Sequence, residues 1–162
     1  MPKLTLACWV RGTVCSVALL LGASAQAQAT AEAPPAYDPA LAAKLGGNDN
    51  GMRQYVLVIL KTGPNRVPAG AERDEMFKGH FANMKRLSDA GKLALAGPFD
   101  GTDGWRGLFI FAVPSVEEAQ ALVATDPVVI KGEMVPEYHV YYGSAALMLV
   151  PDGHQKISKP AQ

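Results

Sequence analysis

Cysteine is scarce in this 162-residue chain, and both of its cysteines, Cys8 and Cys15, lie within the first 29 residues. That segment has the composition of an export signal, with Lys3 and Arg11 ahead of an apolar run over 14–21. Cleavage of the signal leaves a mature chain without a thiol. We therefore expect no disulfide and no cysteine-ligated metal or cluster in the mature protein.

Long apolar runs are also missing. The run over 14–21 is far shorter than the roughly 20 apolar residues that span a bilayer, which favours a cleaved signal peptide over a membrane anchor. Small residues follow it at alternating positions and offer A-x-A cleavage sites after Ala25, Ala27 or Ala29. The sequence predicts a secretory signal peptide over 1–29 and an exported protein, periplasmic or extracellular, with no membrane contact after signal removal.

Charge of one sign is not in excess, since the chain has 15 basic and 15 acidic residues. Without Lys3 and Arg11, 13 basic residues stand against 15 acidic ones, a formal charge of −2. With no basic tail or patch, we expect no nucleic acid as a partner. The sequence also has no glycine-rich phosphate loop, nucleophile elbow or HExxH motif. We expect no cofactor and no metal centre.

Composition divides the mature chain into three parts. Residues 30–52 are rich in Ala, Pro, Gly and Asn and predict a flexible linker, with one short helical turn over 39–45. Residues 151–162, which contain Pro and Gly, predict a disordered tail. The stretch over 53–150 is long enough for one small domain.

The pattern of apolar residues in that domain predicts the element order βαββαβ. Strands are predicted over 54–61, 93–99, 106–113 and 138–147, where β-branched, aliphatic and aromatic residues are bounded by turn residues. This order is that of a ferredoxin-like α+β fold, in which two helices cover one face of an antiparallel sheet.

Two helices lie between these strands. Phe77, Phe81 and Met84 recur at helical spacing and predict a helix over 72–90, followed by Gly91 as a C-cap. Ser115 and Glu118 form a capping box that opens the second helix. Pro127 is predicted to end that helix.

Both faces of the predicted sheet are apolar. In the first strand the two faces carry Val56, Val58 and Leu60 on one side and Tyr55, Leu57 and Ile59 on the other. A sheet with one solvated face should alternate between apolar and polar residues, so the second face is expected to be covered too. A partner's sheet is the simplest cover and predicts a homodimer. The alternative is that the linker or the tail folds over this face.

Several segments together resemble the YciI-like (YCII-related) family of the dimeric α+β barrel superfamily. The likeness spans roughly Arg53 to Tyr142 and is carried by the segments over 79–84, 91–99, 116–121 and 126–132. The resemblance implies a dimeric α+β barrel with a His and Asp pair that lines a pocket between sheet and helices. The matching residues are His80 and Asp126. Most members of the family have no assigned activity, while relatives with this barrel include dehydrochlorinases, lactone isomerases and small monooxygenases.

The chain also departs from the family pattern. It carries an export signal and a linker, and the arginine that usually precedes the histidine is not at the familiar spacing, with Arg73 the nearest candidate. Val128 stands where an aromatic residue often follows Asp-Pro.

A histidine paired with a carboxylate can act as a general base near neutral pH, because an acceptor at one ring nitrogen raises the basicity of the other. His80 and Asp126 are therefore the candidate catalytic residues of a cofactor-free lyase, isomerase or hydrolase that acts on a small polar molecule. A plain structural hydrogen bond between two buried residues is the alternative.

Three further residues are candidates for binding a substrate. Arg73, near the start of the first helix, could hold a substrate carboxylate, although a solvated surface arginine is the alternative. Pro98 could shape the pocket floor or only form a turn. Tyr141 could line the pocket or belong to the core.

Two other functions remain open. The domain could be a non-catalytic module of the cell envelope, for small-ligand binding or assembly. Alternatively, Met76, His80 and Met84 lie four residues apart along one helix and present two thioethers and an imidazole, a donor set that suits Cu(I). Helical core packing also produces such spacing by chance.

Overall fold

The computed structural model describes residues 36–159, so the signal peptide predicted over 1–29 lies outside the described residues. The strands of this region are β1 (Met52–Thr62), β2 (Leu93–Pro98), β3 (Trp105–Phe111) and β4 (Met134–Ser144). Its α-helices are α1 (Pro39–Lys44), α2 (Ala71–Asp89), α3 (Val116–Val123), α4 (Pro127–Ile130) and α5 (Val150–Ile157). Two 3-10 turns, η1 (Thr102–Gly104) and η2 (Ala145–Leu149), complete the set.

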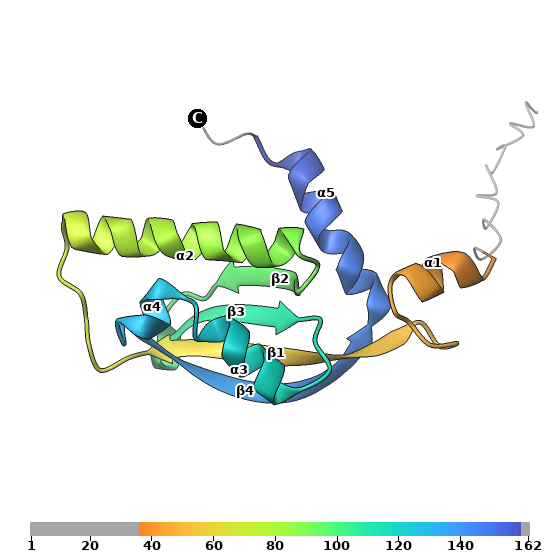
Figure 1. Cartoon of the computed structure of the whole chain (residues 1–162), viewed down its shortest axis with the longest axis horizontal. Helices are drawn as coiled ribbons and strands as arrows, with labels where there is room; N and C mark the ends of the chain where they lie inside the picture. The colour runs from red at the N-terminus through yellow and green to blue at the C-terminus, as the bar shows by residue number, and fades with distance from the viewer. Residues whose placement is uncertain (1–35, 160–162) are drawn as a thin grey trace, which may run out of the picture. The chain divides into compact units, whose positions relative to one another are not determined.

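The four strands form one sheet in the order β2-β3-β1-β4, and neighbouring strands run antiparallel. Figure 1 shows α2 lying along the sheet, with α3 and α4 on the same side. This is the ferredoxin-like α+β arrangement, and it confirms the fold predicted from the sequence.

The main core lies between the sheet and these helices. Alternate residues of β1 point into it, since successive side chains of a strand face opposite sides. They pack with buried residues from each helix on this side, namely Met76 and Leu87 of α2, Ala119 and Val123 of α3, and Val128 of α4. Each helix therefore contributes part of its apolar side to one continuous cluster.

A second, smaller cluster lies on the opposite face of the sheet. Tyr55, Ala94 and Ile110 are buried there, and Leu147 and Met148 of the η2 turn pack against them. The η2 turn, which precedes the tail predicted over 151–162, therefore covers part of this face. Leu57 and Leu108 point to the same face and are half-buried.

The C-terminal segment differs from the prediction. The tail predicted to be disordered from 151 instead forms α5 as far as Ile157. Pro151 stands in the first turn of this helix, where its missing N–H removes no helical hydrogen bond. Similarly, Pro127 opens α4 where the sequence analysis expected only the end of the preceding helix.

The region before the sheet agrees more closely with expectation. The short helical turn predicted over 39–45 is α1, whose first turn is capped by the Asp38 side chain. Within the described range 36–159, none of the helices combines the length and apolar character needed to cross a membrane.

Candidate functional site

His80 and Asp126 are 46 residues apart in the chain and meet in the structure. Nδ1 of His80 lies 2.9 Å from Oδ1 and 2.8 Å from Oδ2 of Asp126. Both residues are buried, with exposed fractions of 7% and 1%. A carboxylate at this position favours the tautomer in which Nδ1–H donates to Asp126, which leaves the lone pair of the ring on Nε2.

Each partner is held in place by its own element. His80 belongs to the buried stripe of α2, whose members follow one another at steps of three or four residues. Asp126 is the N-cap of α4, and its Oδ1 accepts a hydrogen bond of 3.1 Å from the backbone N–H of Val128. One carboxylate therefore both caps α4 and orients the imidazole.

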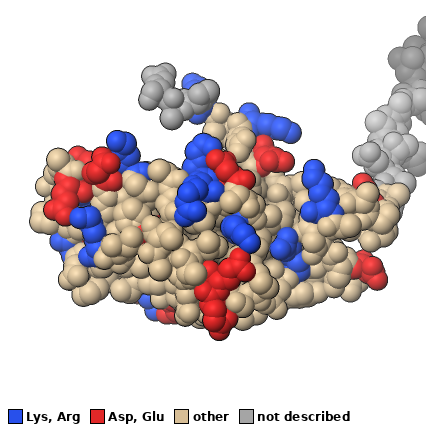
Figure 2. Space-filling model, viewed as in Figure 1, with Lys and Arg blue, Asp and Glu red and all other residues tan. Residues whose placement is uncertain are grey.

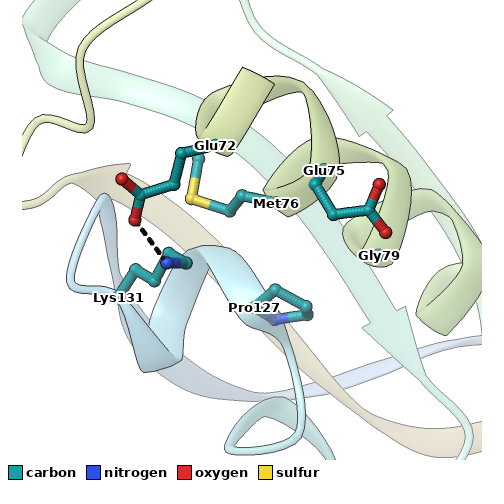
Figure 3. Close-up of a pocket in the computed structure, with 6 residues that line it drawn as sticks. All are labelled: Glu72, Glu75, Met76, Gly79, Pro127 and Lys131. Carbon is teal, nitrogen blue, oxygen red and sulfur yellow. Dashed lines mark hydrogen bonds and ion pairs between the residues drawn. The ribbon is translucent and has the colours of Figure 1, made fainter. Parts of the chain in front are cut away.

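A glycine allows the two elements to approach closely. A Cβ added to Gly79 would lie 3.0 Å from Cγ of Pro127, closer than side chains normally pack. Figure 3 shows the Pro127 ring beneath the turn of α2 that contains Gly79. The missing side chain at position 79 lets α4 lie against α2, and this contact places Asp126 beside the neighbouring His80.

A hollow of about 490 Å³ lies between α2 and α4, on the Gly79 side of the pair. Figure 3 draws the residues that line it. Lys131 of the loop after α4 and Glu72 of α2 are joined across it by an ion pair of 2.6 Å. The hollow is open to solvent, and His80 is not among its lining residues. It therefore gives no direct access to the imidazole.

Aromatic rings surround the imidazole. The ring centroids of Phe81, Phe109 and Phe77 lie 5.4, 6.0 and 6.1 Å from that of His80. Within residues 36–159, Nε2 has no hydrogen-bond partner, and it is not sealed from solvent. The free nitrogen is thus an unpaired acceptor among aromatic rings.

A second polar contact joins α2 to the loop that carries Asp126. Oδ1 of Asn83 accepts hydrogen bonds from Arg86 at 2.6 Å and from the Thr125 hydroxyl at 3.2 Å. Asn83 is buried, and its Nδ2 has no hydrogen-bond partner in the described part of the chain. This contact fixes the residue next to Asp126 and so supports the His80–Asp126 pair from one side.

Arg73 lies two turns before His80 on α2, and its guanidinium group is engaged by protein atoms. It forms an ion pair of 2.8 Å with the buried carboxylate of Glu133 and donates a hydrogen bond of 2.8 Å to the carbonyl of Val67. It also lies over the Phe77 ring, 4.9 Å from its centroid. These contacts give Arg73 a structural role that supports Phe77, which differs from the substrate clamp considered in the sequence analysis.

Glu133 lies between two arginines, since Arg106 is 3.8 Å from the same oxygen that binds Arg73. Burial raises the pKa of the Glu133 carboxyl, but the bonds from Arg73 and from the Val67 N–H, with the charges of both arginines, outweigh burial. The net effect holds the pKa of Glu133 below its ordinary value. Glu133 is therefore a charged, fully buried anchor for the start of α2.

Pro98 and Tyr141 lie on opposite faces of the sheet. Pro98 ends β2 two residues after Ala96, which pairs with Phe109 beside His80, so Pro98 is on the His80 side and is exposed. Tyr141 pairs with Tyr55, whose side chain belongs to the second cluster. Pro98 therefore shares the His80 side of the sheet, whereas Tyr141 lies on the opposite face.

The residues of the Cu(I) alternative are all on α2. Met76 is a core residue and Met84 packs against the same core, while one imidazole nitrogen of His80 is already bound to Asp126. Over residues 36–159 no group of three His, Cys, Asp or Glu side chains is placed to hold a metal ion.

Three buried or partly buried polar residues that support α2 and the Asp126 loop were not found from the sequence, namely Asn83, Arg106 and Glu133. Asn83 could have been noticed because it shares the buried stripe of α2 with His80 at a spacing of three residues. Glu133 and Arg106 carry no such local signal. Their partners lie far away along the chain, so only the folded structure identifies them.

Fold and site together define a ferredoxin-like α+β domain that carries a buried His–Asp pair between α2 and α4. The sequence profile of the YCII-related domain matches residues 54–141, and the chain belongs to that family. None of the curated proteins matches this chain.

Among solved structures, the chain is similar to a 5-chloro-2-hydroxyhydroquinone dehydrochlorinase from Burkholderia phenoliruptrix, in complex with 2,5-dihydroxybenzoquinone. The two chains are 20% identical, and the match covers 53% of this chain and 90% of that chain with a TM-score of 0.37.

Proposed function

We propose that this YCII-related domain is a cofactor-free enzyme in which His80 is the general base and Asp126 orients it. The observation that carries the proposal is the buried contact of 2.8 Å between Nδ1 and the carboxylate, together with an Nε2 that lacks a protein partner. A general base must keep its free nitrogen for the substrate, and an Nε2 without a protein partner supports this role.

In the proposed step, Nε2 of His80 takes a proton from an acidic C–H or O–H group of a small polar molecule. The electron pair left on the substrate either shifts into an adjacent carbonyl or expels a leaving group from the neighbouring carbon. The imidazolium formed is stabilised by the Asp126 carboxylate, and it returns its proton to the product or to water. The reaction class is therefore isomerisation or elimination without a redox cofactor. In the hydrolytic alternative Nε2 takes its proton from a water molecule, the water oxygen forms a bond to the substrate carbonyl carbon, and the imidazolium gives the proton to the leaving group as its bond to that carbon breaks.

Its surroundings support this role. Phe77, Phe81 and Phe109 exclude most water from the ring, which strengthens the attraction between imidazolium and carboxylate. Pro98 lies on the same side of the sheet as the proposed substrate. We include in the proposal that the protein is exported, as its first 29 residues suggest.

The test is to incubate the protein, without added cofactor, with a panel of lactones, hydroxy acids and halogenated phenols. NMR then measures the conversion of each compound. Turnover by the wild type that is lost in His80→Ala, and retained in His139→Ala, supports the proposal. His139 is the matched control because it is half-exposed on β4 and bonds only to Glu137. Equal turnover in wild type and His80→Ala would contradict it.

A non-catalytic ligand-binding or assembly module is the second candidate. The observation that favours it is the low exposure of His80, 7%, beneath three aromatic rings. A structural His–Asp hydrogen bond would have the same burial. In that case His80→Ala would lower the melting temperature and leave ligand binding unchanged.

We also propose a homodimer through the face of the sheet opposite α2. Leu57 and Leu108 remain half-buried there, and Tyr141 is 37% exposed. The η2 turn covers only the part of this face around Tyr55 and Ile110. A second copy would cover the rest, since an apolar sheet face left open to water is unfavourable.

A further inference from the structure

A second hollow, of about 750 Å³, lies between α2, the edge strand β2 and α5. Residues from all three elements line it, among them Phe81 and Met84 of α2, Ala94 and Ala96 of β2, and His154 and Gln155 of α5. Figure 1 shows α5 rising beside the C-terminal end of α2. The volume falls within the range of about 300–1,000 Å³ that is usual for small-molecule pockets.

His80 does not line this hollow, but two lining residues connect the hollow with the surroundings of the imidazole. Phe81 lines the hollow, and its ring is also the closest aromatic neighbour of the imidazole, at 5.4 Å. Ala96 lines it as well and pairs across the sheet with Phe109, a second neighbour of the imidazole at 6.0 Å. Phe81 is 59% exposed, so no packed core holds its ring over His80.

The walls of the hollow combine an apolar floor with one uncompensated cation. Leu93, Leu95 and Val150 extend the apolar surface of Phe81 and Met84. At the rim, Lys85 is paired with Asp89 at 2.6 Å, whereas Lys159 has no carboxylate partner within residues 36–159. Figure 2 shows Lys and Arg side chains interspersed with Asp and Glu over the face it displays. We therefore expect a preference for anions only at the rim of the hollow, near Lys159.

We propose that this hollow binds a small amphipathic organic anion, an apolar ring or short acyl chain that carries one carboxylate or sulfonate. The apolar part lies against Phe81 and Met84, and the anionic group lies at the rim near Lys159. We also infer that His80 acts on anions of this class, and this inference rests on the proposed function. The binding of the anion in the hollow does not depend on that function. The wall formed by α5 lies outside the family match, which ends at residue 141.

The first experiment is calorimetric titration of the purified protein with 2-naphthoate, with neutral 2-naphthalenemethanol as the comparison. We expect one 2-naphthoate per chain and binding of the alcohol that is about three- to fivefold weaker, the effect of one partly screened charge. Equal affinity for both compounds, or no binding of 2-naphthoate at millimolar concentration, would overturn the proposal.

The second experiment locates the bound anion with matched variants. Ser88→Trp fills the hollow and should weaken 2-naphthoate at least about tenfold, whereas Ala82→Trp, on the exposed side of α2, should not change it. Lys159→Gln should weaken binding about threefold, while Lys156→Gln, on α5 but outside the hollow, should not. If neither Ser88→Trp nor Lys159→Gln changes the affinity for 2-naphthoate, the anion binds elsewhere and the proposed site is refuted.

His80→Ala separates this inference from the proposed function. We expect the variant to bind 2-naphthoate within about twofold of wild type, because the imidazole lies behind Phe81, and to lose turnover of any active compound found in the panel. Retained binding with no turnover even in wild type would end the catalytic proposal and leave the binding site standing. Loss of binding in Ser88→Trp without loss of turnover would show that the substrate does not use this hollow.

Discussion

The ring of Pro127 packs so closely against Gly79 that a Cβ at position 79 would be only 3.0 Å from Cγ of Pro127. Gly79→Ala should force α4 away from α2 by a few tenths of an ångström and lengthen the contact between His80 and Asp126. Alanine also favours the helix by about 1 kcal/mol relative to glycine. We therefore expect a nearly unchanged melting temperature with reduced turnover.

Gly97→Ala is the control for this variant, because nothing lies within 4 Å of a Cβ at position 97. Circular dichroism measures the melting temperatures, and the NMR assay measures turnover. A Gly79→Ala protein as active as Gly97→Ala would show that the close packing of α4 does not position the pair.

Asp126→Asn should separate the two tasks of this carboxylate. Asparagine caps helices about as well as aspartate, so α4 should stay formed and the unfolding free energy should change by less than about 1 kcal/mol. The charge that stabilises the imidazolium is lost, and turnover should fall by about 10²- to 10⁴-fold. Asp126→Ala removes the cap as well and should also be less stable. Undiminished turnover in Asp126→Asn would argue against a general-base role for the pair.

The lowered pKa of Glu133 predicts that the folded protein loses stability in acid. Its folded pKa is held below the ordinary value of 4.5, so the unfolded chain takes up the proton first as the pH falls. The stability that Glu133 contributes is complete above 4.5 and is lost as the pH falls from there through the lower folded pKa. Denaturant unfolding between pH 7 and pH 3 measures this change.

Glu133→Gln is the companion variant for the acid experiment. It leaves Arg73 and Arg106 without their shared carboxylate and should cost about 3–5 kcal/mol at pH 7. Its stability should then depend less on pH below 4.5 than that of wild type. The same slope in both proteins would assign the acid sensitivity to other groups.

The proposed homodimer predicts a dependence on Leu57 and Leu108. An aspartate at either position would place a charge in the interface, and sedimentation should then show monomer where wild type shows dimer. Val140→Asp is the control, since this residue is exposed on the edge strand β4 and faces the helix side. A monomeric wild type at all concentrations would reject the dimer.

The fold was predictable because its signals are local. Alternating apolar residues in β1 and β3, the capping box at Ser115, and the glycine after α2 all act within a few residues. Their order along the chain is enough to indicate the sheet and its helices. The same local signals placed His80 on the helix over 72–90 and Asp126 at the end of the second helix, whereas the structure makes Asp126 the N-cap of α4.

The remaining features depended on contacts that no local pattern encodes. Pro127 and Pro151 were interpreted as breakers, although each stands in the first turn of a helix where proline is tolerated. The face occupied by Tyr141 depends on the register between β1 and β4, which pairs it with Tyr55. Glu133 meets Arg73 only because the loop before β4 returns to the start of α2.

Helix α5 begins at Val150, past the end of the segment shared with other YCII-related domains. Amino-acid changes in this terminal stretch reshape one wall of a hollow and leave α2 and α4 untouched. The proposed binding wall and the proposed proton-transfer pair are therefore encoded in separate parts of the chain.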